Sequence, residues 1–492
     1  MDFLDPKKRK AHSRRLFIGY GLMAIAIGLG AVILLYASFG YGVDRSGNLF
    51  QNGIVFLASN PDQAQVKITN TGNSFSKTVV TSDRLNLKAD IYKFQFLKKG
   101  YRPWERTVEL RGGSVERLVY PLLFPDKLTS SRKKQYASTP GLVTQSPDKK
   151  IIIIQKPGTV GSFDVFSSGD SIEQKTGFKL ASNLLPVGSK AEKLELIEWA
   201  KDNRHLLVSY KSGKTKIFIL IDSQKPSASI NLNNVFGLSP LVAELRDKKP
   251  DIFYFQLADN RLLSAQINNK TLSLVAKNVA DFDSHGENTV LYVSKKNNKT
   301  VNVFIRQNNT VQLLRQLPLD KGYNLNMSTY NGKLFVVAGA KSDDNTYVYR
   351  DPVKAFLRKK TDTELTTRTL RLKNVDKVSF SENSQFIAAQ SGQNFDVYDA
   401  DQDRQYHYEI TNKIDSGSEV AWMDGHRLTF VSKSKLVVFD FDGINKQVLV
   451  ESRSQFPAMF NPDYSQLFVV SPTDNSSNNK SQLNQTSLIV AN

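Results

Sequence analysis

The hydrophobic pattern begins with one uninterrupted apolar run. Leu16 to Phe39 spans 24 residues and contains no charged side chain. A helix of that length rises about 36 Å at ~1.5 Å per residue, which is enough to cross a hydrocarbon core of about 30 Å. No second uncharged run of comparable length follows. The pattern therefore predicts one transmembrane helix over 16–39, with the rest of the chain on one side of a lipid bilayer.

Short alternating strands are predicted over 53–123. Apolar side chains occupy every second position in 64–68 and again in 92–96, which is typical of half-buried strands. The segment RTVELRGGSVERLVYPLL, from Arg106 to Leu123, favours a hairpin with the loop Arg111–Ser114. Because no helical period intervenes, this segment is expected to form a small β-sandwich.

This segment resembles the PEGA domain, a small β-sandwich of bacterial and archaeal surface proteins. The signature tetrapeptide reads Pro61-Asp62-Gln63-Ala64 here, without the Glu and Gly that name the family. The resemblance implies a stalk or binding module without catalytic residues. It rests on Gly53 opening a strand, the turn Ser59-Asn60-Pro61, Ala64-Gln65-Val66, Tyr92 beginning the aromatic strand, Gly100-Tyr101, and Leu122 ending the last strand.

From Gly141 onward the chain repeats one plan: an aromatic or apolar residue, a polar turn, and a hydrophobic strand. Phe380 and Trp422 lie 42 residues apart, and Trp422 and Phe460 lie 38 apart. That spacing is the length of one four-stranded propeller blade. About eight candidate units occur, so a seven- or eight-bladed β-propeller is predicted, with Ser487–Val490 as a late strand that closes the ring.

The repeats resemble the WD40-like and TolB-type propellers of bacterial envelope proteins. The resemblance rests on SPDG-like turns that precede a strand, here Ser146-Pro147-Asp148-Lys149 and Asn461-Pro462-Asp463-Tyr464. It implies the fold, since propellers of this kind carry many functions.

The fold class expected is thus an all-β ectodomain on one N-terminal transmembrane helix. Its parts are a basic cytoplasmic tail over 1–15, the helix over 16–39, a juxtamembrane linker over 40–52, the sandwich over 53–123, a basic linker over 124–140 and the propeller over 141–492.

Charges beside the apolar run predict its orientation. Positive charges gather before the run, whereas after it the charges of Asp44 and Arg45 cancel. The positive-inside bias therefore places the N-terminus in the cytoplasm and the bulk of the chain outside the cell. A cleaved signal would need a shorter apolar core and a better site than Ala37-Ser38-Phe39, which favours an uncleaved signal-anchor in the cell membrane. The positive charges that precede the run are Lys7, Lys8, Arg9, Lys10, Arg14 and Arg15.

Composition narrows the setting. The chain of 492 residues contains no cysteine, which excludes disulfides and thiolate chemistry and favours a bacterial surface. Its net charge of +19 favours contact with a polyanion such as an anionic wall polymer, lipid headgroups or nucleic acid met outside the cell, although a lysine-rich surface that only keeps the protein in solution fits the same number. Besides the bilayer, contacted through Leu16–Phe39, an envelope polymer or envelope protein is the expected partner. No intracellular nucleic acid is expected, and the oligomeric state is left open.

Catalytic and metal signatures do not emerge. The five histidines lack metal-ligand spacing, and His205 and His426 occupy equivalent turns of two repeats. Asp399, Asp401 and Asp403 have calcium-loop spacing, but Arg404 stands where that loop requires glycine, so an acidic turn is expected. No nucleophile elbow and no phosphate-binding loop occurs. The chain is therefore expected to be no enzyme and to need no cofactor or metal.

Aromatic residues supply the contact candidates. Trp199 and Trp422 recur at matching repeat positions, which predicts packing between blades. Trp104 follows a proline in an expected exposed loop, and Arg102 and Arg106 flank it. These three residues are the predicted ligand contacts.

The functional hypothesis is a membrane-anchored, non-enzymatic scaffold whose propeller binds envelope polymer or a partner protein. Two alternatives stay open at this point: a propeller-type glycan hydrolase or lyase, and an envelope assembly factor. Carboxylates at the channel mouth favour the enzyme, clustered Lys and Arg favour the polymer binder, and an exposed apolar patch favours the assembly factor.

Overall fold

The described chain forms two compact units, 1–127 with 490–492, and 128–489, here named the N-terminal unit and the propeller unit. The computed structural model describes residues 6–43, 47–72, 74–185, 194–212, 215–357, 366–473 and 480–490.

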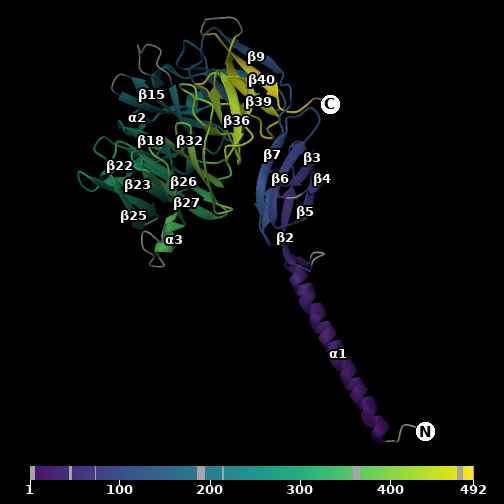
Figure 1. Ribbon diagram of the computed structural model, residues 1–492. Helices are drawn as coiled ribbons and strands as arrows, with labels where there is room; N and C mark the ends of the chain where they lie inside the picture. The colour runs from purple at the N-terminus through teal and green to yellow at the C-terminus, as the bar shows by residue number, and fades with distance from the viewer. Residues whose placement is uncertain are drawn as a thin grey trace. The chain divides into compact units, whose positions relative to one another are not determined.

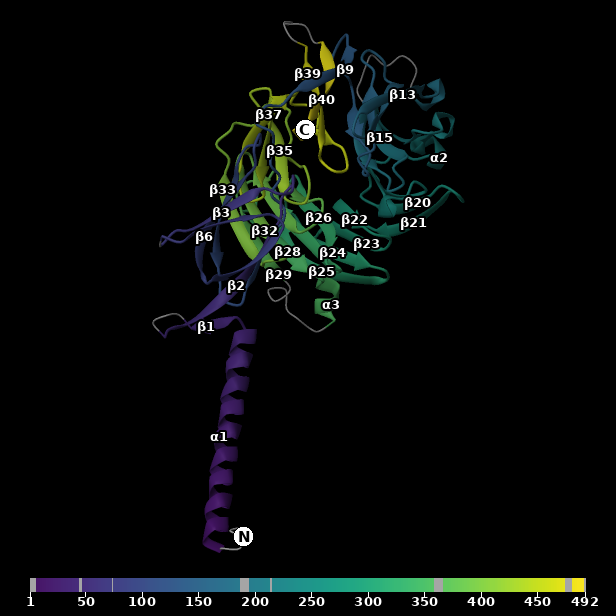
Figure 2. The same ribbon diagram turned by 90° about the vertical axis from the view of Figure 1, so that its right-hand side faces the viewer.

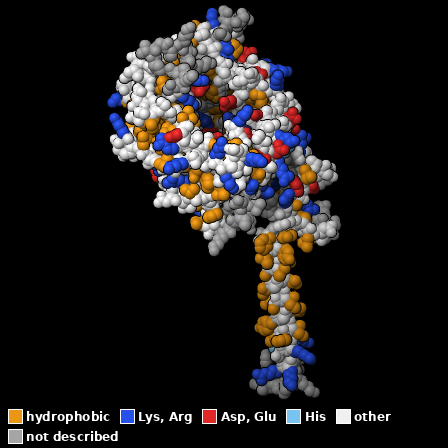
Figure 3. Space-filling view, turned by 90° about the vertical axis from the view of Figure 1, so that its left-hand side faces the viewer, with side chains coloured by type: hydrophobic (Ala, Val, Ile, Leu, Met, Phe, Trp, Pro, Cys, Tyr) orange, Lys and Arg blue, Asp and Glu red, His pale blue; other side chains and the backbone are white. Residues whose placement is uncertain are grey.

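The N-terminal unit begins with helix α1, Pro6–Ser38, which starts within the expected tail. Its stretch His12–Ser38 is long and apolar enough to cross a membrane, and no other helix in the described residues is. Its apolar side chains are exposed, and Figure 3 shows them as a continuous apolar surface with basic side chains at the far end. Such a helix is compatible with a single-pass anchor or a signal sequence. Arg9, Lys10, Arg14 and Arg15 are exposed, whereas the side chains of Lys7 and Lys8 lie outside the described residues.

Two four-stranded sheets follow α1 and pack face to face. Their shared core draws Val55 and Leu85 from one sheet and Val66, Phe94 and Phe96 from the other. One sheet contains β1 (Tyr41–Val43), β2 (Leu49–Leu57), β5 (Asp83–Lys88) and β8 (Val115–Leu118); the other contains β4 (Ser76–Val80), β3 (Gln65–Asn70), β6 (Asp90–Leu97) and β7 (Trp104–Leu110). The expected linker over 40–52 is therefore wrong, because β1 and the start of β2 lie within it.

The expected hairpin around Arg111–Ser114 is also wrong. β7 pairs with β6, but β8 pairs in parallel with β2 in the opposite sheet, so this loop crosses between the sheets. Gly113 has a φ of +73° and donates its N–H to the carbonyl of Asn52 at 2.9 Å. A short Gly-Gly loop fits a hairpin and a tight crossover alike, and only the pairing of β8 decides between them.

The propeller unit consists, in its described residues, of eight four-stranded antiparallel sheets in chain order. The first sheet contains β10 (Val143–Gln145), β11 (Ile151–Gln155), β12 (Ser162–Ser168) and β13 (Ile172–Lys179), and the second contains β14 (Leu194–Trp199), β15 (His205–Ser212), β16 (Thr215–Asp222) and β17 (Ile230–Asn231). The third contains β18 (Val242–Leu245), β19 (Ile252–Gln256), β20 (Leu262–Gln266) and β21 (Thr271–Ala276), and the fourth contains β22 (Val279–His285), β23 (Thr289–Lys295), β24 (Thr300–Gln307) and β25 (Thr310–Pro318).

The second four sheets repeat the same meander, and the two short helices of this unit, α2 (Leu232–Phe236) and α3 (Pro352–Phe356), lie in connections. The strands are β26 (Tyr323–Tyr330), β27 (Lys333–Ala340), β28 (Asn345–Arg350) and β29 (Thr366–Arg371); β30 (Lys377–Phe380), β31 (Phe386–Ser391), β32 (Asn394–Asp399) and β33 (Arg404–Glu409); β34 (Ala421–Trp422), β35 (Arg427–Ser432), β36 (Lys435–Asp440) and β37 (Gln447–Glu451); and β38 (Met459–Phe460), β39 (Gln466–Pro472), β40 (Ser481–Ser487) and β9 (Ser130–Tyr136).

The ring is closed by strands from both ends of the unit. β9, which lies in the segment expected to be a linker over 124–140, pairs antiparallel with β40 and is the outermost strand of the last sheet. The late strand expected over 487–490 lies earlier in the chain, because β40 (Ser481–Ser487) ends at Ser487. The last and first sheets share one core that includes Tyr136, Phe166 and Phe468.

Successive sheets pack against one another because a single four-stranded sheet cannot bury both of its faces. Shared cores join neighbouring sheets, as Leu207 and Phe253 do for the second and third and Val303 and Val336 do for the fourth and fifth. Figures 1 and 2 show the sheets following one another around a ring. The fold is a β-propeller.

Candidate anion-binding site

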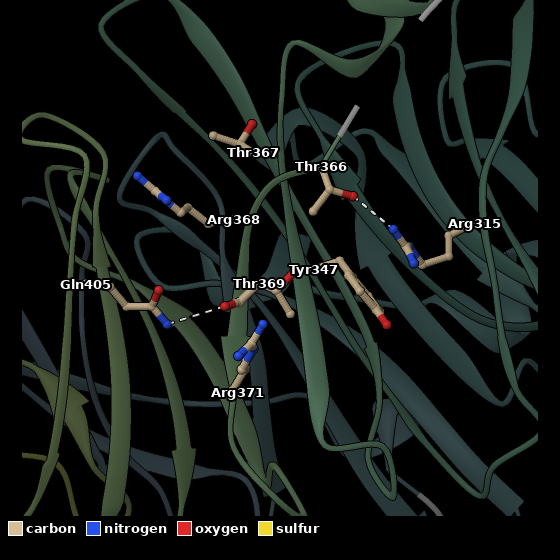
Figure 4. A pocket seen from close by; sticks show the side chains of 8 residues that line it. All are labelled: Arg315, Tyr347, Thr366, Thr367, Arg368, Thr369, Arg371 and Gln405. Atoms are coloured by element: carbon tan, nitrogen blue, oxygen red, sulfur yellow. Dashed lines mark hydrogen bonds between the residues drawn. The ribbon is translucent and has the colours of Figure 1, made fainter. Parts of the chain in front are cut away.

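A hollow of about 540 Å³ lies on the outer edge of the propeller unit and is the most basic of the cavities described. It is bordered by the fourth, fifth and sixth sheets (Figure 4). The residues that line it are Arg315, Tyr347, Thr366, Thr367, Arg368, Thr369, Arg371 and Gln405.

The sequence of β29, TTRTLR, explains why polar residues gather here. β29 is the outermost strand of its sheet and pairs only with β28 among the described strands. Only Leu370 in it is buried, so its threonine and arginine side chains remain at the surface. An outermost strand of a blade has little neighbouring core to pack against, which is why Thr and Arg are tolerated here.

Arg315 is held in place by neutral groups. Its Nε donates to the Tyr349 hydroxyl at 2.9 Å, and its Nη2 donates to the Thr366 hydroxyl at 2.9 Å. The guanidinium lies 3.6 Å from the centre of the Tyr347 ring, a close cation–π contact. The positive charge is therefore oriented without being neutralised.

Arg371 is the second unneutralised cation. Its side chain is exposed and borders the hollow (Figure 4), and it forms no ion pair with a described carboxylate. The nearby acid, Asp396, is buried, and burial raises its pKa. Asp396 is also occupied, because it accepts the backbone N–H of Arg371 at 2.7 Å and the Gln405 amide at 2.8 Å.

Arg368 differs from the other two arginines because it has an acidic partner. Its Nη2 and Nε lie 2.7 and 3.1 Å from the carboxylate oxygens of Asp403. Partial burial opposes ionisation of Asp403, but hydrogen bonds from Arg368 and Tyr398 outweigh it and lower the Asp403 pKa. Because both side chains are about half exposed, this ion pair is weak and an incoming anion can compete for Arg368.

This arrangement suits the binding of an anion. Guanidinium groups recognise phosphate and carboxylate oxygens through paired N–H donors, and the threonine hydroxyls add further donors. Among the described residues that line the hollow, none is a histidine, a carboxylate or a lysine.

The predicted contact residues of the N-terminal unit do not form an exposed site. Trp104 is only 3% exposed and begins β7, where its ring packs edge-to-face with Phe96 and Tyr120. Arg106 is buried and donates a hydrogen bond to the Tyr120 hydroxyl, and Arg102 is half-buried. The prediction of an exposed Trp104 loop is wrong, because Trp104 falls on the inward side of an alternating strand.

The channel side of the propeller carries carboxylates, as the enzyme alternative requires. Figure 3 shows this face hollowed near its centre. Glu198 accepts the backbone N–H of Leu245 and pairs with Lys248, and Glu244 accepts the Ser284 hydroxyl at 3.1 Å. These contacts join the innermost strands β14, β18 and β22 to one another. Burial raises the pKa of Glu244 well above its usual value. The engaged carboxylates serve as links between blades.

The other sequence candidates occupy structural positions. Asp399 accepts the N–H groups of Asp401 and Gln402 at 2.9 and 3.2 Å, so the acidic turn is confirmed. His205 Nδ1 lies 2.6 Å from an Asp202 oxygen within its own turn. Within the part of the chain that the structure describes, no group of three His, Asp or Glu residues could hold a metal ion.

Sequence reasoning missed Arg315, Arg368 and Arg371. They belong to β25 and β29, which the repeat pattern did not resolve because outermost strands lack the hydrophobic run of the inner ones. The available signal was TTRTLR itself, a threonine-rich segment with two arginines and no acid.

Comparison with known proteins identifies no family. No family model and no curated protein sequence matches the chain. Among solved structures, Saccharomyces cerevisiae Sqt1 shares 12% identity, covering 72% of this chain and 97% of its own, with a TM-score of 0.41. The Cps50 (Swd1) β-propeller domain of Myceliophteria thermophila shares 9%, covering 73% and 100%, with a TM-score of 0.37. Kluyveromyces lactis Hsv2p shares 10%, covering 65% and 99%, with a TM-score of 0.37.

Proposed function

We propose that this protein is a non-enzymatic, single-pass membrane protein whose propeller unit binds an anionic polymer of the cell envelope. One observation carries the proposal: Arg315 and Arg371 border one hollow, and neither pairs with a described carboxylate. Arg368, beside them, has only a solvent-exposed acidic partner. An arginine cluster of this kind recognises phosphate or carboxylate groups.

The anchor and topology belong to the same proposal. α1 supplies an apolar surface of sufficient length, and the exposed basic residues at its N-terminal end favour a cytoplasmic N-terminus. The two-sheet sandwich is taken as a PEGA-type display module, and the eight sheets as eight blades. An envelope location outside the cell is consistent with a chain that contains no cysteine and carries a net charge of +19.

The test is co-sedimentation of residues 40–492, which retain β1, with isolated cell envelopes across a salt series. Binding is expected to fall steeply as salt rises, because polyanion binding depends on screened charge. Arg371→Gln is expected to weaken binding several-fold. Lys333→Gln, which removes an exposed charge from β27 outside the hollow, is the matched control and is expected to bind as the parent does.

Two outcomes would contradict the proposal. Equal binding by Arg371→Gln and the parent would exclude the hollow as the binding site. Salt-insensitive binding would instead favour a shaped site for a partner protein, the assembly-factor alternative.

A further inference from the structure

A second basic hollow, of about 470 Å³, lies between the third and fourth sheets, beside the turn that joins β24 to β25. Two arginines, Arg246 and Arg306, border it together with Tyr254 and neutral polar residues. Arg246 lies over the Tyr254 ring at 5.8 Å, as Arg315 lies over Tyr347 in the first hollow. The two hollows thus share an arginine–tyrosine pair.

Both arginines of this second hollow contact only neutral acceptors. Arg246 donates from Nη2 to the Asn288 side-chain oxygen at 2.7 Å and from Nη1 to the Ser264 hydroxyl at 3.3 Å. Arg306 donates to the backbone carbonyls of Val275 and Asn308. Neither forms an ion pair with a described carboxylate, so both keep an uncompensated positive charge at the surface.

The fourth sheet separates the two hollows and contributes to each. Arg306 on β24 reaches back to Val275 of the third sheet, whereas Arg315 on β25 reaches forward to Tyr347 of the fifth. Arg306 is paired in register with Val311. Arg315 lies four residues beyond Val311 along β25, which corresponds to roughly 14 Å at the usual rise of a strand. The two hollows therefore lie on either side of the fourth sheet, about one short strand length apart by this register.

The outermost strands of the third, fourth and fifth sheets, which border these hollows, contain no acidic residue. β21 reads TLSLVA, β25 reads TVQLLRQLP and β29 reads TTRTLR, and none contains Asp or Glu. These are the outermost strands of three consecutive sheets. Among the other outermost strands, β13, β33 and β37 each contain a glutamate, whereas β17 (IN) and β9 (SSRKKQY) contain no acid, so the acid-free edge runs from the second to the fifth sheet and recurs in the last.

We infer that the two hollows bind one linear, phosphate-bearing polymer, which crosses the acid-free edge of the fourth sheet from one hollow to the other. The inference rests on the proposed function and specifies its ligand as a chain of repeated anionic groups. A small anion would need one hollow only. Joining two weak sites through one chain raises the affinity by about 10²–10⁴-fold without any new contact.

The experiment compares a long-chain inorganic polyphosphate with tripolyphosphate as probes of the full-length protein in detergent, at fixed salt. The parent is expected to bind the long chain about 100-fold tighter per chain than tripolyphosphate. The double variant Arg246→Gln/Arg306→Gln should remove most of that difference and retain tripolyphosphate binding at the first hollow. Arg368→Gln/Arg371→Gln should weaken both probes.

The outcomes separate the two proposals. Unchanged long-chain affinity in Arg246→Gln/Arg306→Gln would overturn the two-hollow inference and leave the proposed function standing. Unchanged binding of both probes by Arg368→Gln/Arg371→Gln would overturn the proposed function. If the first double variant unfolds at a lower temperature, Arg246→Lys/Arg306→Lys is used instead, and it should lose long-chain affinity while keeping its salt dependence.

A last arm distinguishes a polymer from a lipid surface. Vesicles of anionic phospholipid present the same phosphate chemistry without a linear chain. If long polyphosphate competes for binding to the protein far better than such vesicles do at equal phosphate concentration, the inference is supported. Equal competition would overturn it.

Discussion

The indole nitrogen of Trp199 lies 2.8 Å from the hydroxyl oxygen of Thr144, and this bond joins the innermost strands of the first two sheets. Trp422 repeats the arrangement between the seventh and sixth sheets, where it donates to the Ser379 hydroxyl at 3.0 Å. The expected packing role of both tryptophans between blades is confirmed. These bonds hold adjacent blades together at the ring's inner side.

Trp199→Phe is expected to lower the free energy of unfolding by about 1–3 kcal/mol, because the buried Thr144 hydroxyl loses its partner and the smaller ring leaves space. Trp422→Phe tests the equivalent bond and should show the same sign. Equilibrium denaturation measures both. A change below about 0.3 kcal/mol in both variants would contradict the structural role of these bonds.

Trp104→Ala should destabilise the N-terminal unit without altering anion binding. Its side chain is almost fully buried among Phe96 and Tyr120, so truncation is expected to cost about 3–5 kcal/mol. Trp104→Phe is the milder control. Loss of polyphosphate affinity in a folded Trp104 variant would contradict this prediction and support Trp104 as a ligand contact.

Asp403→Asn is expected to raise the affinity for anionic ligands. Asp403 pairs with Arg368 at 2.7 Å, and its removal frees that guanidinium for an incoming phosphate. A half-exposed ion pair is worth up to about 1 kcal/mol, so the gain should be at most about 5-fold. Asp401→Asn removes a neighbouring negative charge that accepts a hydrogen bond from the Tyr330 hydroxyl at 3.1 Å, and it should have a smaller effect. Equal gains in anion affinity from Asp403→Asn and Asp401→Asn would show that the effect comes from net charge alone.

Stability should depend on the ionisation of Asp283 near the channel. Burial raises its pKa from 3.8 to about 7, although the Lys248 charge opposes this. A raised folded-state pKa means that the stabilising contribution is full below about pH 4 and is lost as the pH rises through 7.

Asp283→Asn tests this dependence. The parent should lose a few kcal/mol of unfolding free energy between about pH 4 and pH 8 from this group, and the variant should lose less. Denaturant titrations at fixed pH values measure the difference. Glu198 adds negative charge to the same neighbourhood. Burial and the Asp283 charge raise the pKa of Glu244, so Glu244→Gln serves as a second probe. Parallel pH profiles for parent and Asp283→Asn would contradict the prediction.

The sequence by itself determined the apolar helix, the two-part β architecture and the repeating sheets. An uncharged run of 24 residues and a repeat of about 40 residues are local signals, readable without knowing what packs against what. The alternation in 64–68 and 92–96 likewise placed Val66 and Phe94 in a core, as the structure shows.

Only the tertiary structure decided where each strand finds its partner. β9 lies more than 340 residues before β40, and no local pattern reveals that the two close one sheet. β8 joins β2 across the sandwich for the same reason. The arginine cluster is likewise non-local: Arg315 comes from one sheet and Arg371 from the next, and only ring packing brings them to one hollow. Trp104 was misplaced because a proline and two arginines resemble a loop, whereas strand alternation and the rings of Phe96 and Tyr120 set its burial.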